Sequence, residues 1–275
     1  MSNESQDSAL RLNRFLAQAG VCSRRKADEY ITEGRIQVNG KTVFELGLKV
    51  KPEDRITVDH KPIRQVQDKI YLAFFKPEKV LTTLSDPEER PCLTDYLPRN
   101  MKERVFPVGR LDWDSEGLLL LTNDGDFAQE VAHPAKGIPK TYLVKVDGQP
   151  NETHFKKLVS GVSIPGGRAR ALSVRRVKHG KSSKYDWIQI IIDEGRNRQV
   201  RKMFEKIGFD VIKLRRVAIG DYRLGKMIKG QMVTLGLIDL ARVFKTPPEL
   251  RPKEKVKKPS VKKQQTLVKS KKLFQ

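Results

Sequence analysis

The chain of 275 residues carries a formal net charge of +22, and its hydrophobic content of 38% is enough to form globular cores. Residues 251–275 hold ten lysines and arginines against Glu254, so residues 1–250 alone still carry +13. Such a basic body indicates a phosphate-rich partner, either nucleic acid or an anionic membrane surface. The sequence has no apolar run near the ~20 residues of a membrane span and no N-terminal signal pattern. We therefore expect a cytoplasmic protein of about two domains.

Cysteine and histidine usage argues against metal chemistry. Two cysteines, Cys22 and Cys92, cannot make a disulfide framework and lack the spacing of a metal site. The four histidines are scattered along the chain without an i, i+4 pair. We expect no metal and no cofactor.

The first segment has clear helix and hairpin signals. Apolar residues at i, i+3, i+4 and i+7 from Leu12 predict an amphipathic helix that Gly20 ends. Ser23 is expected to cap a second helix, which Gly34 closes. The dipeptide Asn39-Gly40 favours a type I′ hairpin, and a further strand follows it.

The rest of the ordered chain is rich in strand patterns. Strands are expected over residues 69–75, 118–121, 140–146, 186–193, 211–220 and 231–238. The stretch NRQVRKMFEKIG, residues 197–208, predicts a helix, and a proline-rich loop with a short helix follows the first of these strands. Without strict βαβ alternation, this order favours an α+β fold: a small helix-helix-hairpin domain, then a mixed, mainly antiparallel sheet with flanking helices.

Composition shifts divide the chain. The expected parts are a disordered N-terminus 1–9, a small domain 10–63, a linker 64–69, a second domain 70–245 and a disordered basic tail 246–275.

Cations gather at the start of the second predicted helix. Arg24, Arg25 and Lys26 lie in its first turn, where the helix dipole is already positive, so an external anion is expected there. Arg35 extends this basic face. Residues 10–57 resemble the small-subunit ribosomal protein four-type (alpha-L) RNA-binding module, which implies that these cations contact structured RNA.

Three motifs of the second domain carry another resemblance. They are GRLDWDSEGLLLLTNDG at 109–125, KTYLVKV at 140–146 and EGRNRQVRKMF at 194–204. In this order they resemble the ribosomal RNA pseudouridine synthases of the RsuA/RluB/RluF group. The resemblance implies that the N-glycosidic bond of a uridine is broken and the base reattached through carbon, without a cofactor. The loop at 86–98 looks more like the branch that acts on large-subunit rRNA, although small-subunit rRNA stays open.

The resemblance also implies roles for individual residues. Asp112 matches the catalytic aspartate, Tyr142 the tyrosine that stacks on uracil, and Arg201 the arginine that pairs with the aspartate. Arg110 matches the arginine that helps displace the target base. Asp114 and Glu116 are expected to be bystanders.

The charges on the helix predicted over 197–208 are unbalanced, and this can be seen from the residues alone. Arg198, Arg201 and Lys202 share its polar face with Glu205, so an anion from elsewhere is expected there. Arg198 and Lys202 are candidates for phosphate contacts.

Other functions stay open at this point. A core role for Tyr142, in phase with Val144 and Val146, is one alternative. The chain could also be a non-catalytic RNA-binding or ribosome-assembly protein, or a hydrolase that uses Asp112 and Asp114 as an acid/base pair. We expect a monomer that binds rRNA or a pre-ribosomal particle and no membrane.

Overall fold

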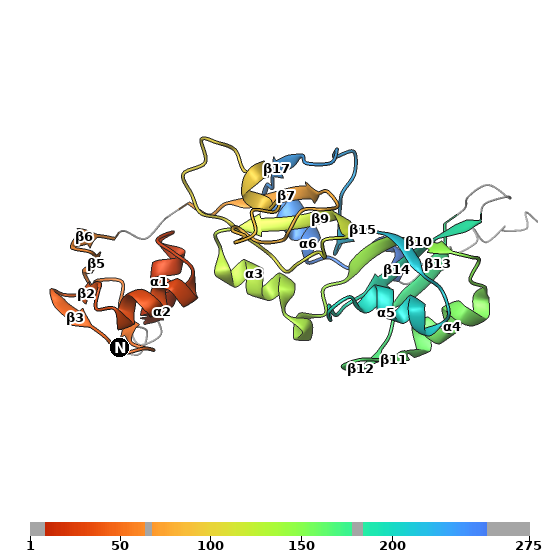
Figure 1. The fold of residues 1–275 in the computed structure, drawn as a ribbon, viewed down its shortest axis with the longest axis horizontal. Coiled ribbons are helices and arrows are strands. Elements are labelled where there is room, and N and C mark those ends of the chain that lie inside the picture. Colours follow the sequence, from red (N-terminus) through yellow and green to blue (C-terminus); the bar gives the residue numbers. More distant parts are fainter. Residues whose placement is uncertain (1–8, 64–67, 178–183, 252–275) are drawn as a thin grey trace, which may run out of the picture.

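The computed structural model describes residues 9–63, 68–177 and 184–251. Most of the predicted linker, the first eight residues and residues 252–275 lie outside the described residues. Two units follow one another along the chain (Figure 1).

The first unit joins two helices to short antiparallel strands. The helices are α1 (Leu12–Gln18) and α2 (Arg24–Thr32). One strand pair is β1 (Leu10–Arg11) with β4 (Lys49–Val50), and a four-stranded sheet has the order β3-β2-β5-β6, formed by β2 (Ile36–Val38), β3 (Lys41–Val43), β5 (Ile56–Val58) and β6 (Lys61–Pro62). Buried Leu12, Leu16, Ala27, Ile31 and Ile36 pack between helices and sheet.

Local signals in this unit act as predicted. The Ser23 hydroxyl accepts a hydrogen bond from the Lys26 backbone N–H at 3.2 Å and caps α2. Asn39 and Gly40 have φ angles of 52° and 82°, as a type I′ turn between β2 and β3 requires.

The second unit is built on one nine-stranded sheet. Its main order is β13-β14-β10-β15-β9-β7-β17, with β16 added to β15 and β8 added to β9. The strands are β7 (Tyr71–Lys76), β8 (Phe106–Pro107), β9 (Ser115–Thr122), β10 (Lys140–Asp147), β13 (Ser173–Arg176), β14 (Tyr185–Ile192), β15 (Val211–Ile219), β16 (Tyr222–Arg223) and β17 (Met232–Thr234). Among these pairs, only β9 with β15 is parallel, which confirms the mixed, mainly antiparallel sheet.

Helices and a small hairpin surround this sheet. They are α3 (Gly125–Ala132), α4 (Glu152–Ser160), α5 (Gln199–Lys206), α6 (Leu237–Val243), the 3-10 turns η1 (Leu93–Tyr96), η2 (Pro134–Lys136) and η3 (Pro248–Leu250), and the hairpin β11 (Val162–Ile164) with β12 (Gly167–Ala169). Within the described residues, no helix has the length and apolar content needed to cross a membrane.

The expected secondary structure differs from the observed one in several places, and the hairpin of β11 and β12 and the strand β13 were also not predicted. Helices α3 and α4 were not predicted, and both begin at side-chain caps, Asp124 and Asn151. The strand expected over 231–238 ends at Thr234, and its last residues start α6 instead. Residues 246–251, assigned to the disordered tail, include η3, where Glu249 pairs with Arg223 at 2.8 Å.

The core lies on both faces of the sheet. Leu119 and Leu121 of β9 face a cluster that includes Phe204 of α5, whereas Leu118 and Leu120 face one that includes Phe127 of α3. Every residue of β9 is buried. A strand covered on both faces reads as a continuous apolar run, which explains the four leucines.

Two backbone features shape the centre of the sheet. Gly117 of β9 has a φ of 116°, and a Cβ there would lie 2.2 Å from the backbone oxygen of Arg216 on β15. On the other side of β15, the register with β10 shifts between Thr141 and Tyr142, so that Val217 has no partner in the pairing. This β-bulge changes which side chains of β15 point to each face.

We expect Gly117→Ala to destabilise the second unit by about 2 kcal/mol or more, since it adds left-handed strain to a backbone clash. Thermal and denaturant unfolding measure this change. Gly125→Ala is the matched control, because a Cβ at Gly125 meets no atom within 4 Å and its φ is not positive. Equal stability of the two variants would contradict the assigned contact.

Candidate active site

The loop that carries Asp112 is fixed on both sides before it enters β9. The backbone N–H of Ser115 donates to the Asp112 carbonyl at 3.1 Å and closes a turn. The Thr82 hydroxyl donates to the Leu111 carbonyl at 2.6 Å, and the Lys79 N–H donates to the Trp113 carbonyl at 2.7 Å. The loop is therefore held by the long segment that follows β7, and Trp113 keeps its side chain partly exposed.

A buried lysine supports the same turn from below. Lys76, at the end of β7, is fully buried, and its Nζ donates to the carbonyls of Pro77, Asp112 and Ser115 at 2.9, 3.1 and 2.9 Å. These three bonds use all three donors of an ammonium group. Burial lowers the pKa of Lys76 to about 8, although the charge of Asp112 opposes that shift.

Glu116 has a structural role that the sequence analysis did not identify. Its carboxylate is fully buried and forms ion pairs with Lys229, at 2.6 Å, and with Arg215. Burial raises the pKa of Glu116, but the hydrogen bonds from Lys229 and Arg215 outweigh burial and hold the pKa below its usual value. Glu116 thus ties β9 to β15 and to the segment before β17.

The predicted anion for the cations of α5 comes from the same loop. Arg198 donates to both carboxylate oxygens of Asp114, at 3.2 and 2.9 Å, and its Nη1 lies 4.0 Å from Asp112 Oδ2. Arg201 pairs with Asp114 Oδ2 at 3.2 Å and donates to the Asp114 carbonyl at 2.7 Å. One carboxylate therefore balances two guanidinium groups.

One prediction is corrected by this arrangement. Arg201 was expected to pair with Asp112, and its partner is Asp114, which was expected only not to contact the nucleotide. The turn between Asp112 and Ser115 points the Asp114 side chain toward α5, and Arg198, at a left-handed φ of 52°, reaches back over the start of the helix. Neither backbone feature is visible in residue spacing.

The Asp114 carboxyl is ionised. Burial raises its pKa, but the hydrogen bonds from Arg198 and the charges of Arg201 and Arg198 outweigh burial and lower it overall. An acid with a lowered pKa is a poor proton donor near neutral pH. Asp114 therefore orients the two arginines and does not supply a proton.

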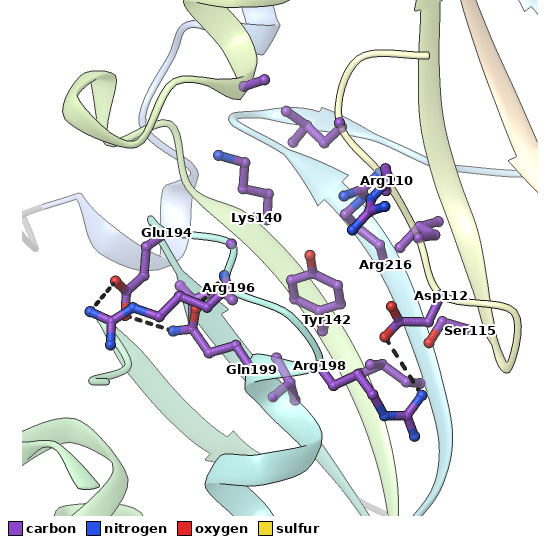
Figure 2. A pocket seen from close by; sticks show the side chains of 18 of the residues that line it. Arg110, Asp112, Ser115, Lys140, Tyr142, Glu194, Arg196, Arg198, Gln199 and Arg216 are labelled. Atoms are coloured by element: carbon purple, nitrogen blue, oxygen red, sulfur yellow. Dashed lines mark hydrogen bonds and ion pairs between the residues drawn. The ribbon is translucent and has the colours of Figure 1, made fainter. Parts of the chain in front are cut away.

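Asp112 and Tyr142 share a pocket of about 280 Å³ between the loop, the sheet and α5. In Figure 2 the Tyr142 ring stands in the middle, with Asp112 and Arg198 on one side and Glu194 and Arg196 on the other. Tyr142 is 8% exposed and also packs in the core, so the predicted platform role and the alternative core role are compatible.

Other predicted residues lie at or beyond the pocket rim. Arg110 is exposed and lines the pocket opening on the Asp112 loop. Lys202 does not line the pocket, and its Nζ lies 3.3 Å from Asn197 Oδ1. A phosphate contact by Lys202 stays a prediction.

Several pocket residues were missed by the sequence analysis. Glu194 pairs with Arg196 at 3.0 Å and accepts a hydrogen bond from Gln199 at 2.8 Å. Lys140 and Arg216 also line the pocket. The period of two along β10 places Lys140 on the face of Tyr142, which was an available signal, whereas Arg216 depends on the pairing of β15.

The predicted RNA-binding cations of the first unit differ in whether they pair with a carboxylate. Arg24 and Arg25 are exposed, and neither forms an ion pair with any described residue. Lys26 pairs with Glu29 at 2.6 Å. Arg35 pairs with Asp59 at 2.5 Å and lies 3.9 Å from the ring centroid of Tyr30.

Metal-binding groups were searched over the part of the chain that the structure describes. No cluster of three or more histidine, cysteine, aspartate or glutamate side chains is arranged to hold an ion there. Cys22 and Cys92 are buried free thiols.

Comparisons with known proteins agree with both units. The family model for RNA pseudouridylate synthase matches residues 70–206, and the S4 domain model matches residues 10–56. Ribosomal large subunit pseudouridine synthase B of Bacillus subtilis (strain 168) is 44% identical over 206 residues, which are 75% of this chain and 84% of that protein. An uncharacterized RNA pseudouridine synthase of Aquifex aeolicus (strain VF5) is 41% identical, covering 86% of this chain and 94% of that protein.

A solved structure supports the fold. A crystal structure of a pseudouridylate synthase superimposes with a TM-score of 0.60 at 24% identity, covering 85% of this chain and 99% of that one. At this identity the likeness concerns the fold alone.

Replacement of Lys76 gives a pH-dependent prediction. The unfolded lysine, with a pKa of 10.5, binds a proton that the folded one, with a pKa of about 8, has released. The unfolding free energy of the wild type should therefore rise relative to Lys76→Met as pH increases from about 8 to 10.5, by up to about 3 kcal/mol.

Denaturant titrations at several pH values measure the difference in unfolding free energy between the wild type and Lys76→Met. The contributions of the other titrating groups are the same in both proteins and cancel in this difference. Exposed Lys102 offers the control Lys102→Met, for which the difference should stay constant with pH. A constant difference for Lys76→Met as well would show that its ammonium titrates as in the unfolded chain.

Proposed function

This chain belongs to the RNA pseudouridylate synthase family, and we propose that it isomerises one uridine of large-subunit ribosomal RNA, with Asp112 as the catalytic carboxylate. The observation that carries the residue assignment is the shared pocket of Asp112 and Tyr142 beside a rim of arginines. The family's reaction needs an ionised carboxylate next to a nucleotide that has left the helical stack.

Asp112 suits this role better than its neighbour. Its side chain is 33% exposed, it lines the pocket, and its nearest cation, Arg198 Nη1, lies 4.0 Å away. Asp114 is engaged by Arg198 and Arg201 at 2.9 and 3.2 Å. One carboxylate is thus left open to substrate, while the other holds the two arginines beside the pocket.

The two arginines act through position and charge. Arg201 is a positioning residue, because its contacts run to the Asp114 side chain and to the backbone of the loop and of β15. Tyr142 offers a flat ring on which a uracil can stack in the pocket. Arg110, at the opening, is placed to occupy the gap that the displaced base leaves.

A hydrolase with an Asp112/Asp114 acid/base pair is disfavoured. Such a pair needs one carboxyl group with a raised pKa to protonate the leaving group. The pKa of Asp114 is lowered by its arginine partners against the effect of burial. Asp114 is therefore unsuited to be the proton donor of such a pair.

The S4 domain and the named relative both favour ribosomal RNA as the substrate class. The S4 domain at residues 10–56 is an RNA-binding module, and exposed Arg24 and Arg25 at the start of α2 add positive potential to it. The Bacillus subtilis relative is named for the large ribosomal subunit, and we extend that substrate to this chain. We also propose that the protein works in the cytoplasm as a monomer, on rRNA or a precursor particle.

A non-catalytic assembly factor on the same fold is the runner-up. It would bind the same RNA through the S4 domain without needing Asp112. Removal of the Asp112 carboxylate therefore separates the two functions.

Asp112→Asn keeps the size of the side chain and removes its charge, so the single-turnover rate should fall by about 10³-fold or more. Single-turnover time courses with purified protein and RNA measure this loss, and carbodiimide-based mapping of pseudouridine in both ribosomal RNAs, from cells that carry the variant, identifies the subunit. Asp210→Asn, at an exposed carboxylate outside the pocket, should leave the modification unchanged. Persistence of every pseudouridine with Asp112→Asn would support the assembly factor.

The basic tail gives a second prediction from sequence charge. Deleting residues 251–275 removes ten lysines and arginines, so RNA affinity should fall and its dependence on salt should flatten. Binding assays at several salt concentrations measure the slope, and the target uridine should stay the same. A change of the modified position would mean that the tail selects the sequence.

A further inference from the structure

The floor of the pocket holds two cations that the proposed function leaves without a role. Lys140 lies two residues before Tyr142 on β10, and Arg216 of β15 is the register partner of Tyr142. All three line the pocket, and Figure 2 shows Lys140 and Arg216 beside the Tyr142 ring. A base stacked on this ring has both cations near its edge.

Arg216 is buried but incompletely bonded. It is 4% exposed, and its Nε donates to the Leu118 carbonyl at 2.7 Å. Its Nη2 is buried without a hydrogen-bond partner in the structure. A guanidinium stays protonated in proteins, so the site keeps a permanent positive charge and an unused donor. An unused buried donor is costly, which indicates a group that the substrate supplies.

Lys140 is half-buried and has no ion-pair partner among the described residues. Burial lowers the pKa of Lys140 to about 8, and the charge of Arg216 adds to this effect, while Asp193 opposes it. The protein therefore holds two like charges together without a matching anion.

The other charged groups of the pocket cannot serve as that anion. Glu194 is paired with Arg196 at 3.0 Å, and Asp112 lies nearest to Arg198, at 4.0 Å. Asp193 acts on Lys140 only through its charge, without an ion pair in the described chain. The missing negative charge has to arrive with the substrate.

Depth identifies the part of the substrate that meets these cations. Phosphates stay on the backbone of the RNA, and the rim provides Arg110 and Arg198, whose side chain is 43% exposed, to meet them. A displaced base enters further than its phosphates. Arg216, at 4% exposure, therefore faces the base and not the backbone.

We propose that Lys140 and Arg216 are further catalytic residues, which stabilise the negative charge that develops on the uracil carbonyl oxygens when the N-glycosidic bond breaks. The electron pair of the N1–C1′ bond stays on the uracil and spreads onto its two carbonyl oxygens. The base then turns, C5 bonds to C1′, the C5 proton leaves, and N1 takes up a proton. Fixed cations aimed at developing charge act as an oxyanion hole does.

This inference rests on the proposed function, because it takes Tyr142 as the stacking platform. Loss of one such donor typically lowers the rate about 10²-fold to 10³-fold. We expect Lys140→Met and Arg216→Gln each to lower the single-turnover rate about 10²-fold with less than about a threefold change in RNA affinity. Lys140→Arg, which keeps the charge, should retain most of the activity.

A better leaving group separates this role from a structural one. RNA with 5-fluorouridine at the target releases a more stable base anion, because fluorine withdraws electron density. We expect each neutral variant to lose at least about tenfold less rate on this RNA than on uridine RNA, measured as consumption of the nucleotide by chromatography of nuclease digests. Lys145→Met, on the opposite face of β10, should behave as wild type with both RNAs.

The opposing outcomes are distinct. Equal losses with uridine and 5-fluorouridine, or a loss of affinity with an unchanged rate, would overturn the inference and indicate a structural or phosphate-binding role. If the neutral variants fail to fold in thermal unfolding, Lys140→Arg decides, since a rate as low as that of Asp112→Asn would contradict charge stabilisation. Wild-type protein that modifies no ribosomal RNA would overturn the proposed function itself.

Discussion

The site depends on the close approach of β9 and β15, the two strands that run parallel at the centre of the sheet. Gly117 makes this approach possible, because any side chain there would collide with the backbone of Arg216. On one side of the contact Glu116 pairs with Arg215, and on the other Arg216 donates to the Leu118 carbonyl. The same contact thus fixes the Asp112 loop and places Arg216 in the pocket.

Rigid support and open chemistry are divided between neighbouring residues. Lys76 and Glu116 are fully buried, Lys76 donates three hydrogen bonds and Glu116 forms two ion pairs, and together they hold the ends of the turn. Asp114 is half exposed and holds Arg198 and Arg201. Asp112, between these groups, is left with the longest ion-pair distance and faces the pocket. The loop reads as dense charge in the sequence because each of its carboxylates has a different task.

The sequence predicted the parts that follow from local periodicity. The apolar run of β9, the amphipathic face of α5, the Ser23 cap and the Asn39-Gly40 turn are set by nearest neighbours along the chain. The sequence could not predict which side chains pair when they come from distant parts of the chain. Arg201 binds Asp114 and not Asp112, because a tight turn and a left-handed Arg198 decide the geometry. Lys140 and Arg216 come together in the pocket only because β10 and β15 pair side by side (Figure 2).

The bulge at Val217 sets a constraint on chain length as well as on residue type. Arg216, before the bulge, and Ile219, after it, both line the pocket. In a regular strand, residues three positions apart would point to opposite faces of the sheet. Loss of one residue from this short interval would turn one of the two side chains away while leaving the composition of the strand almost unchanged. The interval from Arg216 to Ile219 is therefore a place where evolution can exchange residues but cannot easily insert or delete them.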